Sequence, residues 1–161
     1  MGRSAHDRWM GAVLGTTTRA HRILDRLSGG RLGRHLPGGA QVVWIHTRGR
    51  RSGIWRRYPL LAARETDTSW VVAGSNAGQA RLPGWVYNIS AYDRGWVDMN
   101  GEHWAVRYEE ALGADRDAMY ELMIGVWKAY ASYGSHSPRY IPVFRIHLLE
   151  QVPADALPPR T

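Results

Sequence analysis

Cysteine is absent from the 161-residue sequence, and its absence excludes several kinds of chemistry. Disulfide bonds, thiol catalysis and cysteine-bound zinc or iron–sulfur centres all need this side chain. The seven histidines are scattered, and no two have the spacing that places metal ligands together on a helix or a strand. Neither a metal site nor a paired-carboxylate site for acid–base catalysis is therefore expected.

Long apolar runs are also absent from the sequence. No segment approaches the roughly 20 apolar residues that cross a bilayer as a helix. The N-terminal residues lack the apolar core of a secretory signal. The sequence therefore predicts a cytoplasmic protein.

Lysine is scarce, since Lys128 is the only one, so arginine carries nearly all of the positive charge. The formal net charge of +7 favours an anionic partner: a nucleic acid, an anionic membrane surface or an acidic small molecule. Guanidinium groups pair well with phosphates and carboxylates. Eight tryptophans and eight tyrosines suit a pocket for a flat ligand, although the same residues also build ordinary cores and rims.

The length fits a single domain over residues 1–161. Within it we expect an N-terminal helix in residues 1–28, a core over residues 41–150 and a loose tail over residues 151–161. Apolar residues recur at helical spacing between residues 6 and 27, with arginines between them. This amphipathic helix either packs on the domain or makes a weak contact with a membrane surface.

The pattern of the core is that of short strands with few helices. Strands are predicted at residues 42–47, 54–63, 70–75, 95–100, 103–111 and 142–150, and helices from residue 83 and over residues 113–133. The pair Asn100 and Gly101 is a strong signal for a hairpin. Many short strands with two or three helices predict an α+β fold built on an antiparallel barrel.

The first segment with possible chemistry, residues 47–59, is a basic turn between two predicted strands. Its anion-binding groups are Arg50, Arg51, Ser52 and Arg56. Two glycines let the backbone turn tightly and expose N–H groups, which suits a phosphate. Strand alternation places Arg57 on the face opposite Arg56. A solvated basic turn explains the same residues equally well.

The second segment, residues 74–88, leads from a predicted strand into a predicted helix. Ser75 and Asn76 follow the strand, and the helix begins near Pro83. Such a junction offers free N–H donors to an anion, although an ordinary strand-to-helix loop has the same spacing.

The third segment contains Tyr130 and Tyr133, which are three residues apart and share one face of the predicted helix. Either hydroxyl can donate a hydrogen bond to a carbonyl or nitro oxygen of a ligand. Two core tyrosines satisfied by the backbone are the alternative.

Together the three segments resemble the deazaflavin-dependent nitroreductases of actinobacteria, also called F420H2-dependent quinone reductases. The resemblance covers about residues 26–150 and rests on motif blocks in the same order and spacing. The matching positions are residues 28–31, 49–60 and 75–89, Tyr130, Tyr133, Arg139 and residues 141–143. Arg51 and Arg81 replace lysines of the family pattern and keep the charge.

The resemblance implies an FMN-binding type of split β-barrel with flanking helices, and coenzyme F420 as the cofactor, with FMN less favoured. The implied clamp for the phosphate and carboxylates of the cofactor consists of Arg50, Arg51, Ser52 and Arg56. The implied wall beside the ring consists of Arg57, Tyr58, Pro59, Leu60 and Leu61. Further implied contacts of the cofactor are Ser75, Asn76, Gly84, Trp85, Asn88 and Tyr130. The cofactor's phosphodiester and polyglutamate tail explain a basic turn without nucleic acid, which is not expected as a partner.

The implied function is hydride transfer from reduced coenzyme F420 to a small organic acceptor: a quinone, an enone or a nitro compound, including a natural-product intermediate. The resemblance implies Tyr130, Tyr133 and Ser75 as catalytic groups, and Tyr130, Tyr133 and His136 as contacts of the acceptor. The alternatives are a non-redox deazaflavin- or flavin-binding protein, or a barrel reused for another reaction. We expect a monomer or a homodimer.

Overall fold

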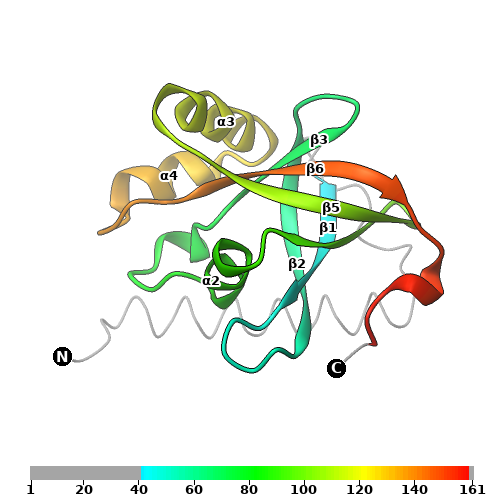
Figure 1. The fold of residues 1–161 in the computed structure, drawn as a ribbon. Coiled ribbons are helices and arrows are strands. Elements are labelled where there is room, and N and C mark those ends of the chain that lie inside the picture. The colour runs from blue at the N-terminus through cyan, green and yellow to red at the C-terminus, as the bar shows by residue number, and fades with distance from the viewer. Residues whose placement is uncertain (1–40, 160–161) are drawn as a thin grey trace, which may run out of the picture.

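A computed structural model describes residues 41–159 (Figure 1). Six strands form a closed antiparallel barrel in the order β1-β2-β3-β6-β5-β4. The strands are β1 (Gln41–Arg48), β2 (Trp55–Arg64), β3 (Ser69–Ala73), β4 (Arg94–Met99), β5 (Glu102–Ala111) and β6 (Val143–Gln151). The predicted α+β antiparallel barrel is confirmed. The helix predicted within residues 1–28 lies outside the described residues.

Turn chemistry fixes the hairpin of β4 and β5. Asn100 and Gly101 both have positive φ, at 54° and 83°, which is the combination that a two-residue turn of type I′ requires. The register follows from this turn, since Met99 pairs with Glu102 and Asp98 with His103. The predicted hairpin is confirmed.

Strand alternation fills the barrel with apolar side chains. Val43 and Ile45 of β1 are fully buried and face the interior. Their partners across the β1–β2 ladder are Leu60 and Tyr58, which pack against the same core. Residues between them in sequence therefore face outwards.

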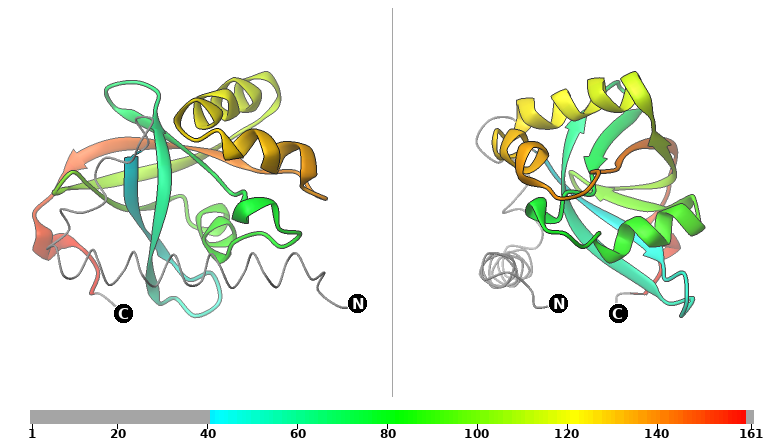
Figure 2. Two further views of the ribbon diagram at one scale, coloured as in Figure 1. Left: turned by 180° about the vertical axis from the view of Figure 1, so that it is seen from behind. Right: turned by 90° about the vertical axis from the view of Figure 1, so that its left-hand side faces the viewer.

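Within residues 41–159, three helices flank the barrel, and Figure 2 shows how they are arranged around it. α2 (Gly84–Ala91) buries Trp85, whose ring meets Phe144 of β6 edge-on at 5.8 Å. α3 (Gly113–Val126) and α4 (Ala129–His136) pack over the outer face of β2 and β3, in a second apolar cluster. Two short 3₁₀ helices, η2 (Asn76–Gly78) and η3 (Ala154–Ala156), complete the described elements.

The prediction of one helix over residues 113–133 is wrong. The backbone of Trp127 is extended, with φ −152° and ψ 103°, and it separates α3 from α4. Gly125 and the β-branched Val126 precede the break, and both lower helix propensity. The break turns α4 back over the barrel, so that it lies beside η2.

The C-terminal segment leaves β6 and continues into η3. The Val152 N–H donates to the carbonyl of His103 at 2.9 Å, which holds the start of this segment on β5. Among residues 41–159, no helix is both long and apolar enough to span a membrane.

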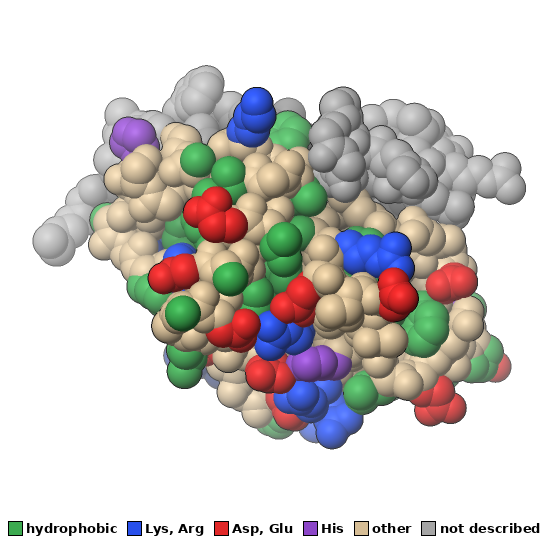
Figure 3. Space-filling model, turned by 90° about the horizontal axis from the view of Figure 1, so that it is seen from above, with side chains coloured by type: hydrophobic (Ala, Val, Ile, Leu, Met, Phe, Trp, Pro, Cys, Tyr) green, Lys and Arg blue, Asp and Glu red, His purple; other side chains and the backbone are tan. Residues whose placement is uncertain are grey.

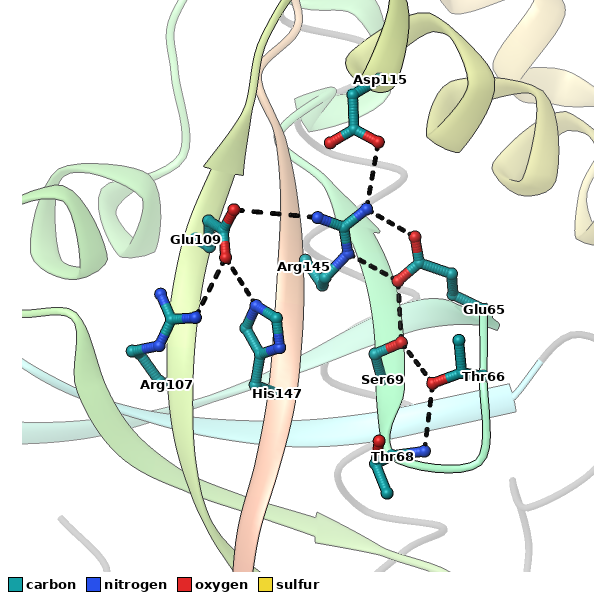
Figure 4. Close-up of polar contacts among 9 residues, drawn as sticks. All are labelled: Glu65, Thr66, Thr68, Ser69, Arg107, Glu109, Asp115, Arg145 and His147. Carbon is teal, nitrogen blue, oxygen red and sulfur yellow. Dashed lines mark hydrogen bonds and ion pairs between the residues drawn. The ribbon is translucent and has the colours of Figure 1, made fainter.

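A cluster of charged side chains joins β5, β6 and α3 to the loop between β2 and β3 on the outside of the barrel (Figure 4). Arg145 of β6 donates two hydrogen bonds to Glu65, both of 2.6 Å, and a third to Asp115 of α3 at 3.1 Å. Glu109 of β5 accepts from His147 at 2.7 Å. On the face drawn in Figure 3, the described acidic and basic side chains are interspersed in the same way, so the described part of this face carries no extended basic patch.

Candidate cofactor site

The turn between β1 and β2 is a rigid support for basic side chains. The Gly49 N–H donates to the carbonyl of Ile54, and the Gly53 N–H donates to the carbonyl of Gly49, each at 2.8 Å. Gly53 has a φ of +69°, which L residues rarely adopt. A Cβ at Gly49 would collide with the Ser52 hydroxyl and the Ile54 carbonyl. The two glycines therefore let the turn close with Arg50 and Arg51 at its tip.

Asn88 of α2 anchors this turn to the helix. Its Oδ1 accepts a hydrogen bond from the Arg50 N–H at 3.1 Å, and its Nδ2 donates to Thr47 Oγ1 at 3.0 Å. Asn88 and Thr47 are both buried. The two ends of the amide thus hold together the end of β1, the basic turn and α2.

A cavity of about 340 Å³ lies between the turn, β2 and α2. It is lined by Gly49, Arg50, Arg51, Ser52, Arg56, Tyr58, Arg81, Leu82, Gly84, Tyr87 and Asn88. The structure therefore brings together seven of the sequence-predicted cofactor residues, which come from two separate motif blocks. They are Arg50, Arg51, Ser52, Arg56, Tyr58, Gly84 and Asn88.

The cavity is electropositive. It has four arginines, and within residues 41–159 none of their guanidinium groups lies within 4.0 Å of a carboxylate, whereas Arg57, Arg64 and Arg145 all form ion pairs. Arg50 lies over the ring of Tyr87, 4.4 Å from its centroid. The positive end of the α2 dipole adds to this charge, because Gly84, the first residue of α2, lines the cavity. The site has the charge and the donors to bind a phosphate or a carboxylate.

Sequence reasoning missed several residues of this wall, of which Arg81, Leu82 and Tyr87 contribute side chains. A signal for Tyr87 was present, since Gly84, Tyr87 and Asn88 follow the i, i+3, i+4 pattern of one helix face. For Arg81, the sequence indicates only that an arginine replaces a lysine of the family pattern, and not that it lines the cavity.

The segment predicted as a wall beside the ring is divided between the two faces of β2. Tyr58 lines the cavity and Leu60 packs in the barrel interior, whereas Leu61 packs in the outer cluster below α3. Pro59 lies opposite Trp44 in the ladder and shares its outward face. Arg57 also faces outwards: its Nη2 is 3.1 Å from Asp98 and its guanidinium is 3.9 Å from the Trp44 ring centroid. Because side chains alternate between the two faces of a strand, only part of this segment turns its side chains toward the cavity.

Trp85 and His136 also lie away from the cavity. Trp85 is only 3% exposed and belongs to the barrel core. His136 is exposed at the end of α4, where its Nδ1 lies 3.0 Å from the carbonyl of Ser132 and 3.0 Å from the Ser135 hydroxyl. Its ring is thus engaged by its own helix.

Ser75, Tyr130 and Tyr133 form a second group, where the loop that follows β3 meets α4. Burial raises the pKa of Tyr130 well above its usual value, the neighbouring tyrosines raise it further, and a hydrogen bond with Ser75 opposes the shift. The rings of Tyr130 and Tyr133 meet edge-on at 5.6 Å. Tyr130 and Ser75 are buried and Tyr133 is half-buried. A phenol with a raised pKa stays protonated at neutral pH, so it can donate a hydrogen bond.

Asn76 contacts its own loop. Its Nδ2 donates to the carbonyl of Arg81 at 2.9 Å and to Gln79 Oε1 at 3.3 Å. Its side chain closes the loop that ends at the cavity wall.

Comparison with known proteins gives concordant results. A family model described as F420H(2)-dependent quinone reductase matches residues 17–147. An F420H(2)-dependent quinone reductase of Mycobacterium tuberculosis is 29% identical over 140 residues, which cover 84% of this chain and 93% of the relative.

Two solved structures share the fold. A structure described as an F420-H2 dependent reductase (FDR-A) superimposes with a TM-score of 0.61 at 26% identity, covering 66% of this chain and 93% of that one. A second, described as a domain-swapped dimer, has a TM-score of 0.62 at 22% identity, covering 80% and 99%. The resemblance inferred from the motif blocks is confirmed, and the chain belongs to the F420H(2)-dependent quinone reductase family.

Proposed function

We propose that the cavity between the β1–β2 turn and α2 binds the anionic part of coenzyme F420, and that the chain uses the reduced cofactor to reduce a quinone-type acceptor. The observation that carries this proposal is the set of four arginines around one cavity, where no carboxylate of residues 41–159 forms an ion pair with them. Uncompensated guanidinium groups on a built cavity favour an anionic ligand. The family assignment identifies the class of that ligand.

The residues of the cavity fit this cofactor. Arg50, Arg51, Arg56 and Arg81 offer planar donors to a phosphodiester and to carboxylates. Tyr58 and Leu82 add apolar and aromatic surface at the same cavity. Coenzyme F420, when bound in its reduced form, supplies a hydride to the acceptor. The chain then needs no acid–base dyad and has to hold the cofactor and acceptor together and exclude water.

Ser75, Tyr130 and Tyr133 are proposed to face the acceptor. Hydride transfer to a quinone builds negative charge on its oxygen, and a nearby hydroxyl donor stabilises that charge. Tyr133 is the best placed of the three, because it is half-buried and so more accessible than Tyr130. An enone or a nitro compound develops similar charge and is a further acceptor class.

Titration of the purified protein with F420, followed by fluorescence, tests the cofactor site. In the double variant Arg51→Ala and Arg56→Ala, we expect the affinity for F420 to fall at least about 10-fold, because charge-assisted hydrogen bonds are lost. The melting temperature should change little, since both side chains are exposed.

Arg64→Ala is the matched control. Arg64 is an exposed arginine of the same strand, but it pairs with Asp67 at the opposite end of β2. FMN titrated in parallel should bind more weakly than F420. Equal F420 affinity in the double variant and the wild type would mean that the arginines of the basic turn are solvated and do not bind the cofactor. Tight binding of F420 without turnover of any quinone would favour a non-redox carrier.

The predictions on partners and location stay open to experiment. A monomer or a homodimer is distinguished by light scattering on the purified chain. Weak contact of residues 1–28 with a membrane surface is tested by sedimentation with anionic vesicles at low and high salt, since salt screens such contacts. A cytoplasmic location is tested by fractionating cells that express the full chain.

A further inference from the structure

Arg139 lies in the segment between α4 and β6, and it binds the loop of residues 74–82 with nearly its whole guanidinium group. Its Nε donates to the carbonyl of Gln79 at 3.0 Å. Its Nη2 lies 3.0 Å from the carbonyls of Gly74 and Ser75 and 3.3 Å from that of Arg81. The remaining nitrogen, Nη1, donates to the carbonyl of Tyr140 at 3.0 Å. Four carbonyls of one short loop thus converge on one side chain.

The loop needs such an anchor because its backbone is strained. Asn76 and Ala77 have φ values of 45° and 53°, in the left-handed region that non-glycine residues rarely adopt. Conformations of this kind persist only where the surroundings hold them in place.

Arg139 differs from the partly buried Arg57 and Arg145 in what it binds. Arg57 and Arg145 are both fixed by carboxylates, whereas no carboxylate within residues 41–159 lies within 4.0 Å of the Arg139 guanidinium. The partly buried charge is instead balanced by carbonyl dipoles. Burial lowers the pKa of Arg139, although the group remains charged in proteins. Only the planar fork of an arginine can reach this many carbonyls, because lysine has three donors at one point.

The loop held by Arg139 joins the two parts of the candidate site. Figure 1 shows it between α4 and α2, and Figure 2 shows the same arrangement from two other sides. At its start, the Ser75 side chain lies close enough to the Tyr130 phenol to influence its pKa. At its end, Arg81 and Leu82 line the cavity. The position of this one guanidinium therefore affects both ends.

We propose that Arg139 is a positioning residue that fixes residues 74–82 so that Arg81 and Leu82 face the cofactor cavity while Ser75 faces Tyr130. The inference rests on the proposed function of that cavity. It assigns no contact with cofactor or acceptor to Arg139 itself, since all three guanidinium nitrogens already donate to backbone carbonyls.

The test compares Arg139→Ala, Arg139→Lys and Arg116→Met with the wild type. Arg116 is the matched control, because its guanidinium also donates to a carbonyl, that of Ile141, at 2.8 Å and 3.2 Å, but not to the loop. Hydrogen exchange of the cofactor-free protein reports on the loop directly. In Arg139→Ala we expect the amides of residues 74–82 to exchange at least about 10-fold faster than in the wild type. In Arg139→Lys their exchange should be only slightly slower than in Arg139→Ala. Arg116→Met should show no such local change.

F420 affinity and chemical rescue complete the test. Affinity should fall about 10-fold in Arg139→Ala, because the cavity wall is no longer preorganised. Millimolar guanidinium should restore both the slow exchange and much of the affinity, whereas urea, a neutral molecule of the same shape, should not. Arg139→Lys keeps the charge and gives a folded alternative if the alanine variant does not fold.

Each outcome decides between the two proposals. Unchanged exchange in the loop, or faster exchange spread evenly over the chain, would overturn the role of Arg139. Faster local exchange with guanidinium rescue supports it, even if the wild type does not bind F420. In that last case the loop is positioned by Arg139 and the proposed function is the part that fails.

Discussion

At the scale of single residues, Tyr130 and Tyr133 differ in what they offer a ligand. Tyr130 is buried between Tyr120 and Tyr133, and its carbonyl accepts the Tyr120 hydroxyl at 2.7 Å. Tyr133 is half-buried and packs against Gly78, whose φ of +75° belongs to the loop held by Arg139. Tyr130 is therefore fixed by the core, and Tyr133 is the more accessible of the two hydroxyls, the one that we propose an acceptor reaches.

The variant Tyr133→Phe tests this assignment. We expect kcat with a quinone to fall about 10- to 100-fold, because a hydrogen bond to developing negative charge is lost. F420 affinity should stay near the wild-type value, since Tyr133 does not line the cavity. Tyr140→Phe, at an exposed tyrosine stacked on Arg116, is the control. Equal turnover in Tyr133→Phe and the wild type would remove Tyr133 from the acceptor site.

For single residues, the sequence predicts which side chains can bind an anion better than it predicts where each side chain points. The arginines of the basic turn were found because guanidinium groups beside glycines suggest an anion, and they do line one cavity. Trp85 matched the family motif, yet its ring fills the barrel core. Whether a side chain lines a cavity or the core depends on which element packs against it, and a motif does not contain that information.

At the scale of elements, Asn88 connects the basic turn to α2. Its amide is buried and satisfied at both ends, by the Arg50 N–H and the Thr47 hydroxyl. In Asn88→Ala, both partners lose their bond, and we expect unfolding stability to fall by about 2 kcal/mol. F420 affinity should fall as well, because the turn is no longer held against the helix.

Chemical denaturation and F420 titration measure the two effects. Ser90→Ala is the control in the same helix, since the exposed Ser90 hydroxyl donates only to the Val86 carbonyl. A stability loss without any loss of affinity would show that the turn keeps its shape without Asn88.

Element prediction succeeded where local chemistry determines structure. The β4–β5 turn was predicted because Asn100 and Gly101 tolerate positive φ, and the strands because apolar residues alternate. The break at Trp127 was missed, since the apolar spacing of α3 continues through it into α4. The tertiary contact of α4 with η2 decides where the second helix lies, and such a contact is not visible in a local window.

At the scale of the whole molecule, the charged side chains on the outside of the barrel differ from those of the cavity in whether they form ion pairs. The outer charged cluster around Arg145 is paired, whereas the arginines of the cavity have no ion pair with any carboxylate in the described part of the chain. The net charge predicted an anionic partner but not where it binds. Only the closure of the barrel places residues 50–56 beside residues 81–88, because these segments are distant in sequence.

Barrel closure itself depends on a buried carboxylate, Asp98 of β4. It accepts from His46 of β1 at 2.9 Å and from His103 of β5 at 2.8 Å, and it forms an ion pair with Arg57 of β2, whose Nη2 lies 3.1 Å away. Burial alone would raise the pKa of Asp98, but hydrogen bonds from the two histidines and the charge of Arg57 outweigh it and lower the pKa. One carboxylate thus links four strands, including the β1–β4 pair that closes the barrel.

This arrangement predicts loss of stability in acid. A carboxyl group whose pKa is lower in the folded chain stabilises the fold above its unfolded pKa, about 4 for aspartate, and this contribution disappears as the pH falls through the folded value. In Asp98→Asn, we expect unfolding stability at neutral pH to fall by about 3 kcal/mol, because Arg57 and the histidines lose a buried anionic partner.

Urea denaturation of both proteins from neutral pH down to about pH 3 measures the contribution. Glu65 and Glu109 also have lowered pKa values, through Arg145 and His147 respectively. Both glutamates are present in the wild type and in the variant, so they contribute equally to the acid response of the two proteins. The difference between the two proteins therefore isolates Asp98. It should be constant above about pH 5 and should shrink below about pH 4, because protonated aspartate loses its attraction to Arg57. A difference that stays constant over the whole range would mean that Asp98 acts as a neutral hydrogen-bonding group and that its charge does not stabilise the closed barrel.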